Sequence, residues 1–391
     1  MFIAEDVKYI GVNDPDVRLF EGQYPTPNGM AYNSYLILDE RIAILDSVEA
    51  GCRDRWLAAI RSRLGDRRPD YLIIQHMEPD HSANIAEFVK EYPEVRLVST
   101  AAAFKMMEAF FGTDFKENRI VVTDGSTLTL GRHSLAFLTA PMVHWPEVMM
   151  TYDDYDKILF SADAFGKFGT VDACEDWREE ARRYYIGIVG KYGKQVQALL
   201  KKLAALDVEI ICPLHGPILP ENLEYYLWFY DTWSSYRPEI CGVTIAVSSI
   251  YGNTLSAAKQ LLSELREKGV SAELYDLNRT HSSEAVAAAF KSSHLVLASA
   301  TYNTDVFPSM RALLHGLAER GYRDRRVYLI ENGSWAPSAA KVMREELAGC
   351  ADVVISDRVV RVNSAVNDGT RGEISRLAEE IASSVLSCDA D

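Results

Sequence analysis

The residues best suited to chemistry stand in one short run, His76, Met77, Glu78, Pro79, Asp80 and His81. Imidazole and carboxylate groups dominate this run, and both are good metal ligands. It follows an apolar stretch, residues 71–74, that is typical of a buried β-strand. We therefore expect a metal-binding loop at the end of a strand.

Three further candidate ligands each close an apolar run of their own. His144 ends LAFLTAPMVH, Asp163 ends KILFSAD and His215 ends EIICPLH. Taken singly, such a histidine is more often a hydrogen-bonded core or loop residue than a ligand. Four unrelated runs that end in a ligand are typical of an α/β fold that assembles a site at the carboxyl ends of its strands. The pattern therefore predicts one metal centre.

Composition restricts the partners and the size of the folding units. The chain has 391 residues, which suggests two or three domains, and 41 basic against 56 acidic residues give a net charge of -15. This charge argues against nucleic acid and anionic membranes as partners. No stretch approaches the ~18 apolar residues of a membrane span, and the first residues do not resemble a signal peptide. We expect a cytoplasmic protein.

The six cysteines contain no CxxC pair. This spacing disfavours a disulfide framework and a rubredoxin-like or zinc-ribbon site. We expect six structural thiols.

Two rhythms of secondary structure divide the chain. Through residue 240, strand patterns outnumber helices, and helices are expected over 53–63, after 82, and over 105–110, 175–186, 195–206 and 221–236. From residue 241, five apolar runs alternate with helical patterns, which predicts a five-strand doubly wound α/β unit. Pro238 and Gly242 mark the boundary. We expect domains at 1–240 and 241–391.

A second candidate site lies in the later half. A helical pattern follows the residues Ser248, Ser249, Ile250, Tyr251, Gly252, Asn253 and Thr254. Hydroxyls, amides and a helix amino terminus would converge there on a phosphate, although ordinary capping uses the same residues. Two more loops close the third and fourth strand runs, with the residues Ser299, Ala300, Thr301, Tyr302 and Asn303, and Asn332, Gly333, Ser334 and Trp335. Tyr302 and Trp335 could supply flat apolar walls for a bound aromatic ring.

These three loops resemble those of flavodoxin, whose fold binds flavin mononucleotide (FMN). Ala300 stands where flavodoxin-like relatives often have proline, a change that should alter loop stiffness. A glycine-rich dinucleotide fingerprint is absent, which disfavours a nicotinamide cofactor.

The amino-terminal pattern resembles the metallo-β-lactamase fold, whose hydrolases usually carry HxHxDH and bind zinc. Glu78 stands in place of the second histidine. A carboxylate there makes the site harder and more anionic, which favours iron or manganese over zinc. With both halves considered, the chain closely resembles the flavodiiron proteins over essentially its whole length, including HWPEVMMTYD and ILFSADAFG. The resemblance implies an αββα metallo-β-lactamase-like sandwich followed by a flavodoxin-like doubly wound parallel sheet.

The resemblance also implies the ligand set. His76, Glu78 and His144 would bind one iron, Asp80 and His215 the other, and Asp163 would bridge them. His81 matches a position that is turned away or stands behind the ligands in flavodiiron proteins, so we expect it beside the site. Trp145, Tyr184 and Tyr185 are candidates for the pocket wall, with core packing as the alternative.

The implied function is electron transfer from FMN to a diiron site that reduces dioxygen to water, nitric oxide to nitrous oxide, or both. The implied electron donor is rubredoxin or a reduced deazaflavin. The implied assembly is a head-to-tail homodimer, or a dimer of such dimers.

The residues leave two alternative hypotheses of function open. One is a zinc-dependent hydrolase of the metallo-β-lactamase type with an appended flavodoxin module, against which Glu78 argues. The other is a non-enzymatic electron carrier or flavin-bound sensor, which would turn over neither gas.

Overall fold

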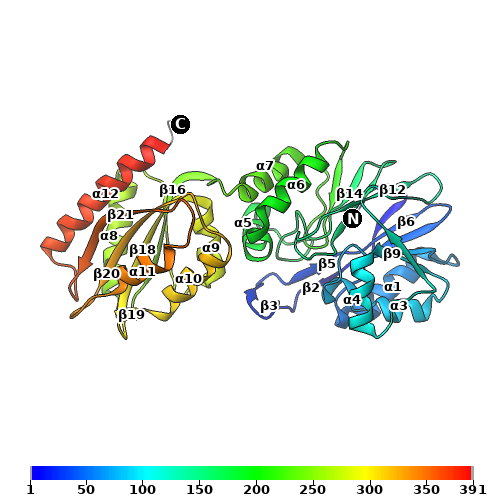
Figure 1. Cartoon of the computed structure of the whole chain (residues 1–391), viewed down its shortest axis with the longest axis horizontal. Coiled ribbons are helices and arrows are strands. Elements are labelled where there is room, and N and C mark those ends of the chain that lie inside the picture. Colours follow the sequence, from blue (N-terminus) through cyan, green and yellow to red (C-terminus); the bar gives the residue numbers. More distant parts are fainter. Residues whose placement is uncertain (1, 389–391) are drawn as a thin grey trace. The chain divides into compact units, whose positions relative to one another are not determined.

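The computed structural model describes residues 2–388 and divides the chain into two compact units, Met1–Asp231 and Thr232–Asp391 (Figure 1). Each unit has its own sheets and its own hydrophobic core.

The first unit contains two large sheets. One has the order β1-β6-β7-β8-β9-β10, with parallel pairing from β7 onward. Its strands are β1 Val7–Tyr9, β6 Tyr35–Leu38, β7 Ile42–Leu45, β8 Tyr71–Ile73, β9 Arg96–Thr100 and β10 Arg119–Val122. The other sheet runs in chain order through β11 Thr127–Thr129, β12 Ser134–Thr139, β13 Met149–Asp153, β14 Ile158–Phe160 and β15 Ile210–Cys212. Two short ribbons pair β2 Val12–Asp14 with β5 Met30–Tyr32, and β3 Leu19–Phe20 with β4 Tyr24–Pro25.

The alternation of side chains along β7 shows how the layers form. Ile42 and Ile44 lie in the core cluster shared with the helices, whereas Ala43 and Leu45 lie in the cluster between the two sheets. Successive side chains of a strand point to opposite faces, so a fully apolar strand is buried on both sides. The first sheet therefore has helices on one face and the second sheet on the other.

Helices cover both outer faces of this sandwich. The first sheet packs on α1 Arg53–Leu64, α3 Ile85–Glu91 and α4 Ala101–Phe111. Leu159 and Ile211 of the second sheet line an apolar cavity with Leu200 and Leu203 of α6 Gly193–Leu203 and Leu227 of α7 Leu223–Ser234. The predicted αββα sandwich is confirmed.

Short helical segments complete the unit. They are α2 Pro79–Ser82, α5 Trp177–Tyr184, the 3₁₀ turns Ala50–Cys52 and Gly190–Tyr192, and a π-helical turn Tyr185–Val189. The single helix expected over 175–186 is thus α5 followed by the π turn. Asp176 caps the start of α5, because its side chain accepts a hydrogen bond from the backbone N–H of Arg178.

The second unit is a five-strand parallel sheet with the order β17-β16-β18-β20-β21. Its strands are β16 Ile240–Ser248, β17 Ala272–Asp276, β18 Ser292–Tyr302, β20 Arg326–Asn332 and β21 Val354–Val362, with β19 Asp305–Val306 as a short antiparallel addition. This order is that of flavodoxin-like sheets, whose topological switch point lies between the first and third strands, here β16 and β18. The predicted doubly wound fold is confirmed.

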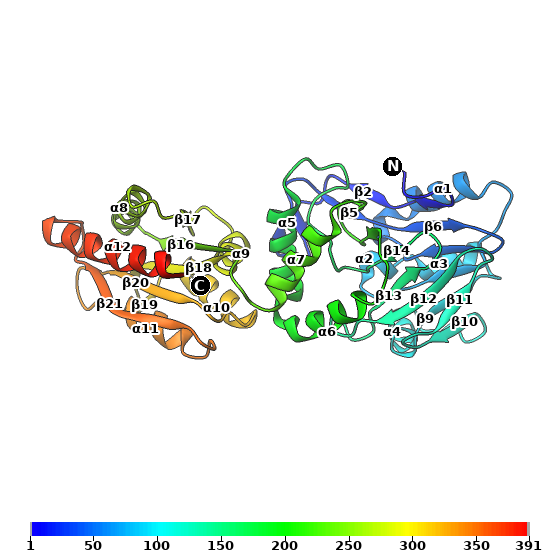
Figure 2. The same ribbon diagram turned by 90° about the horizontal axis from the view of Figure 1, so that it is seen from above.

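Helices cover both faces of this sheet (Figure 2). One core cluster joins the sheet to α8 Asn253–Glu267 and α12 Asp368–Cys388. The opposite face carries α9 Ser282–Lys291, α10 Pro308–Glu319 and α11 Ala339–Leu347.

One cysteine prediction was wrong. Cys241 and Cys388 are joined by a disulfide that links the start of β16 to the end of α12. The partners are 147 residues apart, and such a pairing has no local sequence signal. The remaining cysteines, Cys52, Cys174, Cys212 and Cys350, are free thiols.

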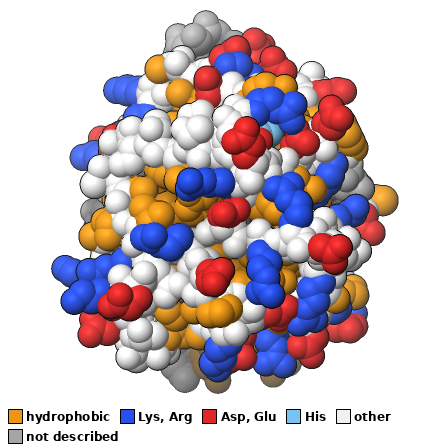
Figure 3. Space-filling model, turned by 90° about the vertical axis from the view of Figure 1, so that its right-hand side faces the viewer, with side chains coloured by type: hydrophobic (Ala, Val, Ile, Leu, Met, Phe, Trp, Pro, Cys, Tyr) orange, Lys and Arg blue, Asp and Glu red, His pale blue; other side chains and the backbone are white. Residues whose placement is uncertain are grey.

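The surface agrees with the mixed composition. On the face drawn in Figure 3, acidic and basic side chains are interspersed rather than gathered into a field of one sign. Within residues 2–388, no helix combines the length and the apolar character that crossing a membrane requires.

Candidate functional site

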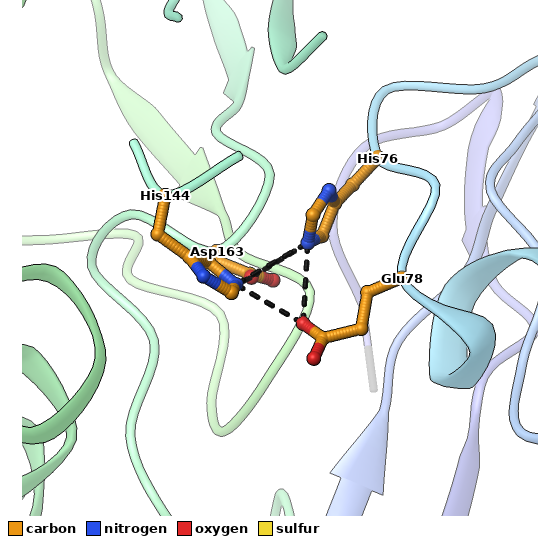
Figure 4. Close-up of side chains that lie close together, drawn as sticks. All are labelled: His76, Glu78, His144 and Asp163. Atoms are coloured by element: carbon orange, nitrogen blue, oxygen red, sulfur yellow. Dashed lines mark hydrogen bonds and ion pairs between the residues drawn. The ribbon is translucent and has the colours of Figure 1, made fainter. Parts of the chain in front are cut away.

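The first group of candidate ligands consists of His76, Glu78, His144 and Asp163 (Figure 4). Oε2 of Glu78 lies 3.2 Å from Nε2 of His76 and 3.0 Å from Nε2 of His144. Oδ2 of Asp163 lies 3.3 and 3.0 Å from the same two nitrogens. Two imidazoles and two carboxylates thus point at one another, as they would around a shared cation.

A second group adjoins the first and contains Asp80, His81 and His215. Nε2 of His81 lies 3.0 Å from Nε2 of His215, and Oδ2 of Asp80 lies 3.3 Å from each of these nitrogens. The other carboxylate oxygen of Asp163, Oδ1, lies 3.4 Å from His81 Nε2. Asp163 therefore stands between the groups, with one oxygen toward each.

The position of His81 differs from the expectation. Its ring is fully buried and turned into the second group, not away from it. His81 belongs to α2, and its backbone carbonyl accepts hydrogen bonds from both the N–H and the hydroxyl of Ser47. Sequence resemblance could not supply this orientation, because it depends on how α2 is seated against the loop at residues 46–48.

Each candidate ligand follows the carboxyl end of a strand. The 76–81 run follows β8, His144 follows β12, Asp163 follows β14 and His215 follows β15. The two sheets contribute one and three of these strands, respectively. Pro79 begins α2, a position that proline favours because its missing N–H would have no helical partner.

Several buried oxygens in the site have no hydrogen-bond partner. They are both carboxylate oxygens of Asp80 and both of Asp163. Burial of an ionised carboxylate without donors is costly unless a cation compensates. The donor set therefore fits metal ions.

The pKa shifts of the candidate ligands reflect the electrostatic interactions between these carboxylates and imidazoles. Burial alone would lower the pKa of His144, but the adjacent carboxylates of Asp163 and Glu78 outweigh burial and raise it to about 9. The pKa of Asp163 lies well below its usual range, because His76, His144 and His81 outweigh the effect of burial. The carboxylates thus hold positive charge among the imidazoles, and a metal cation can take the place of those protons.

Two further contacts fix the orientation of two imidazole rings through their Nδ1 atoms. Nδ1 of His76 lies 2.9 Å from Oε1 of Glu147, and Nδ1 of His215 lies 2.7 Å from the carbonyl oxygen of Ala31. A histidine that donates from Nδ1 presents Nε2 to a metal. Sequence reasoning did not single out Glu147, although it stands three residues after His144 in the HWPE motif.

The aromatic candidates differ in what they contact. The Trp145 ring lies edge-on to His76, with centroids 5.3 Å apart, and the Tyr184 ring lies 5.5 Å from His215. The Tyr185 ring packs against Tyr230 at 5.1 Å. Trp145 and Tyr184 therefore contact candidate ligands directly.

In the second unit, the candidate phosphate loop joins β16 to α8. Gly252 precedes the helix with φ +90°, a left-handed conformation that favours glycine. Its N–H donates to Oγ of Ser249 at 3.1 Å. No side chain among the described residues caps the first amides of α8, so these N–H groups and the hydroxyl of Thr254 lie at the amino terminus of a 15-residue helix. This arrangement suits an anion.

The two other candidate loops lie at the same edge of the sheet, at the ends of β18 and β20. Tyr251, Tyr302 and Trp335 are 92%, 45% and 83% exposed, which is unusual for three large aromatic rings at one edge. The other residues predicted to bind the cofactor are Ile250 and the polar residues of the same loops. Thr301 has a structural task, because its hydroxyl accepts hydrogen bonds from the backbone N–H groups of Ser338 and Ala339 at the start of α11.

Two residues that sequence reasoning missed support these loops. Nδ2 of Asn278, after β17, donates to the carbonyl oxygen of Ser249 at 2.5 Å. The Ser364 hydroxyl, after β21, donates to Oγ of Ser334 at 2.7 Å. Neither residue belongs to a recognisable motif, and both reach the loops only through the order of the strands.

Comparisons with known proteins agree with this architecture. Residues 30–216 match a family described as "ODP family beta lactamase". The chain is 26% identical over 368 residues to the nitric oxide reductase of Moorella thermoacetica, with 91% of each chain covered. It is 27% identical over 353 residues to the anaerobic nitric oxide reductase flavorubredoxin of Salmonella typhi, covering 87% of this chain and 73% of that one.

Among solved structures, the rubredoxin oxygen:oxidoreductase of Desulfovibrio gigas superposes with a TM-score of 0.91 at 26% identity over 100% of both chains. A likeness that extends through both units in sequence and fold goes beyond either fold taken alone. Through both of its units, the chain is therefore similar in sequence and fold to flavodiiron proteins, and it is an oxidoreductase.

Proposed function

We propose that this chain passes electrons from FMN to a non-haem diiron site and reduces dioxygen to water, nitric oxide to nitrous oxide, or both. The observation that carries the proposal is the position of Asp163, with one carboxylate oxygen toward each group of ligands. The names of the relatives support both substrates, because they include nitric oxide reductases and an oxygen oxidoreductase.

The donor set suits iron better than zinc. His76, Glu78 and His144 would hold one ion, and Asp80, His81 and His215 the other, with Asp163 shared. Three carboxylates and four imidazoles form a mixed oxygen and nitrogen set, and Glu78 adds negative charge where zinc hydrolases use a histidine. Iron ions bound here would supply redox chemistry toward a diatomic gas.

The loops of the second unit suit FMN. Ser249, Asn253, Thr254 and the amide groups at the start of α8 would bind the phosphate. The exposed rings of Tyr302 and Trp335 would lie against the flavin, and the Asn332–Trp335 loop would border its polar edge. Ser299, Ala300 and Asn303 would line the flavin site between the rings of Tyr302 and Trp335.

We also propose the partners. Rubredoxin or a reduced deazaflavin would supply electrons, and the flavin of one subunit would serve the irons of the other in a head-to-tail homodimer. A fully active monomer in sedimentation at assay concentration would overturn the dimer.

The test is anaerobic. Protein loaded with iron and FMN is reduced with excess donor, and the consumption of dioxygen and of nitric oxide is followed on electrodes in separate runs. Turnover of either gas that is lost in D163N supports the proposal. Loaded protein that consumes neither gas overturns it. Two zinc ions together with hydrolytic turnover would establish the zinc hydrolase instead.

A further inference from the structure

A third group of potential metal ligands lies at the opposite end of the strands that carry the diiron candidates. It contains His133, Asp153 and Asp156, each of which offers one ligand atom within 4.8 Å of the others. His133 precedes β12, Asp153 ends β13, and Asp156 precedes β14. His144 and Asp163 follow the other ends of β12 and β14, so the two sites are separate.

His133 has the geometry of a metal-ligating histidine. Its Nδ1 lies 2.8 Å from Oδ2 of Asp153, and both side chains are fully buried. A carboxylate that accepts from Nδ1 presents Nε2 as the free ligand atom. Nε2 of His133 is itself buried and has no hydrogen-bond partner. Buried ring nitrogens are ordinarily satisfied, so this one points to a ligand.

The surroundings of Nε2 carry an excess of negative charge. Oδ2 of Asp6 lies 3.7 Å from it, and Oδ2 of Asp156 is buried without a hydrogen-bond partner. Asp39 accepts a hydrogen bond from the backbone N–H of His133 at 2.7 Å. Arg132, which pairs with Asp6, is the cation among these groups. Four carboxylates against one guanidinium leave room for a divalent cation.

We propose that His133, Asp156 and Asp6 bind a divalent transition-metal ion of the zinc class, with Asp153 orienting the imidazole. One nitrogen and two carboxylate oxygens suit zinc, and water would complete a tetrahedron. Asp6 precedes β1 of the first sheet, whereas His133 and Asp156 precede strands of the second sheet. The ion would therefore join the two layers of the sandwich and act as a structural site.

The experiment uses the full chain with iron and FMN bound. Zn²⁺ is titrated in by calorimetry, and zinc and iron are counted per chain after dialysis. We expect one zinc per chain with the iron content unchanged, and a rise of several degrees in Tm. D156N should weaken this binding at least tenfold, whereas D154N should not, because Asp154 is 71% exposed and pairs with Lys157 instead.

Three results would overturn the proposal. The first is no zinc retained while iron is retained. The second is zinc that displaces iron one for one, which would place it in the diiron site. The third is equal zinc affinity in D156N and D154N. The iron content of each variant reports independently that its sandwich is folded, so a loss of zinc binding cannot be mistaken for a loss of structure.

Discussion

Glu147 accepts a hydrogen bond from the imidazole of His76, with Oε1 and Nδ1 2.9 Å apart and both side chains buried from solvent. The same oxygen accepts from the backbone N–H of Met77 at 2.9 Å. Glu147 thus fixes both the ring orientation of His76 and the start of the metal-binding loop. It is a positioning residue that contacts a ligand rather than the metal.

Removal of this carboxylate should weaken iron binding. We expect E147A to lower the affinity for iron about 10- to 100-fold, because His76 loses the acceptor that sets its tautomer. E147Q should lose less, since its amide oxygen can still accept from Nδ1 of His76. Competition with a chelator measures the affinities. Equal affinities in wild type and E147A would show that Glu147 does not position His76.

His81 should matter for one metal ion and not for the other. We expect H81N to bind its second iron at least about tenfold more weakly, a change of ~1.4 kcal/mol, while the ion at His76, Glu78 and His144 is retained. Iron content after dialysis against a weak chelator checks this. H315N is the matched control, because His315 is 71% exposed on α10. Two irons retained with wild-type affinity would place His81 outside the ligand set.

The phosphate loop should discriminate FMN from riboflavin. We expect S249A and T254V to weaken FMN binding about tenfold or more, because a hydrogen bond to a charged group contributes ~1.5–3 kcal/mol. Riboflavin lacks the phosphate, so its affinity should not change. Flavin fluorescence quenching measures both ligands. S263A, an exposed position further along α8, serves as the control. Equal losses for both flavins would place the phosphate elsewhere.

Acid should destabilise the second unit through His294. Burial and, to a smaller extent, the nearby charge of Arg326 lower the pKa of His294 to about 4. Its ring nitrogens lie 2.7 and 2.8 Å from the hydroxyl oxygens of Ser293 and Ser384. The unfolded chain, with a pKa near 6.5, binds more protons between these values, so stability is full above pH 6.5 and falls as pH drops toward 4.

The expected loss from this histidine between pH 7 and pH 5 is about 2 kcal/mol. Urea unfolding of wild type and H294Q at both pH values measures it, and H294Q should lose less stability over that interval. H315Q should behave as wild type, because His315 is exposed. The same loss in H294Q as in wild type would assign the acid sensitivity to other groups.

The sequence by itself determined the two folds and where the reactive loops begin. Apolar runs followed at once by His144, Asp163 or His215 predict strand ends, because a buried strand must give way to polar residues where it leaves the sheet. The alternation after residue 241 predicts the doubly wound sheet in the same way. These are local signals, written within a few residues of each element.

Tertiary structure decided which side chains meet. The packing position of α2 turns His81 toward His215. The pairing of β12 with β13 brings Glu147 to His76. The order of β20 and β21 brings Ser364 to Ser334. The disulfide between Cys241 and Cys388 spans 147 residues. Such contacts depend on strand order and on the direction of a side chain in space, and neither is encoded in the spacing of residues along the chain.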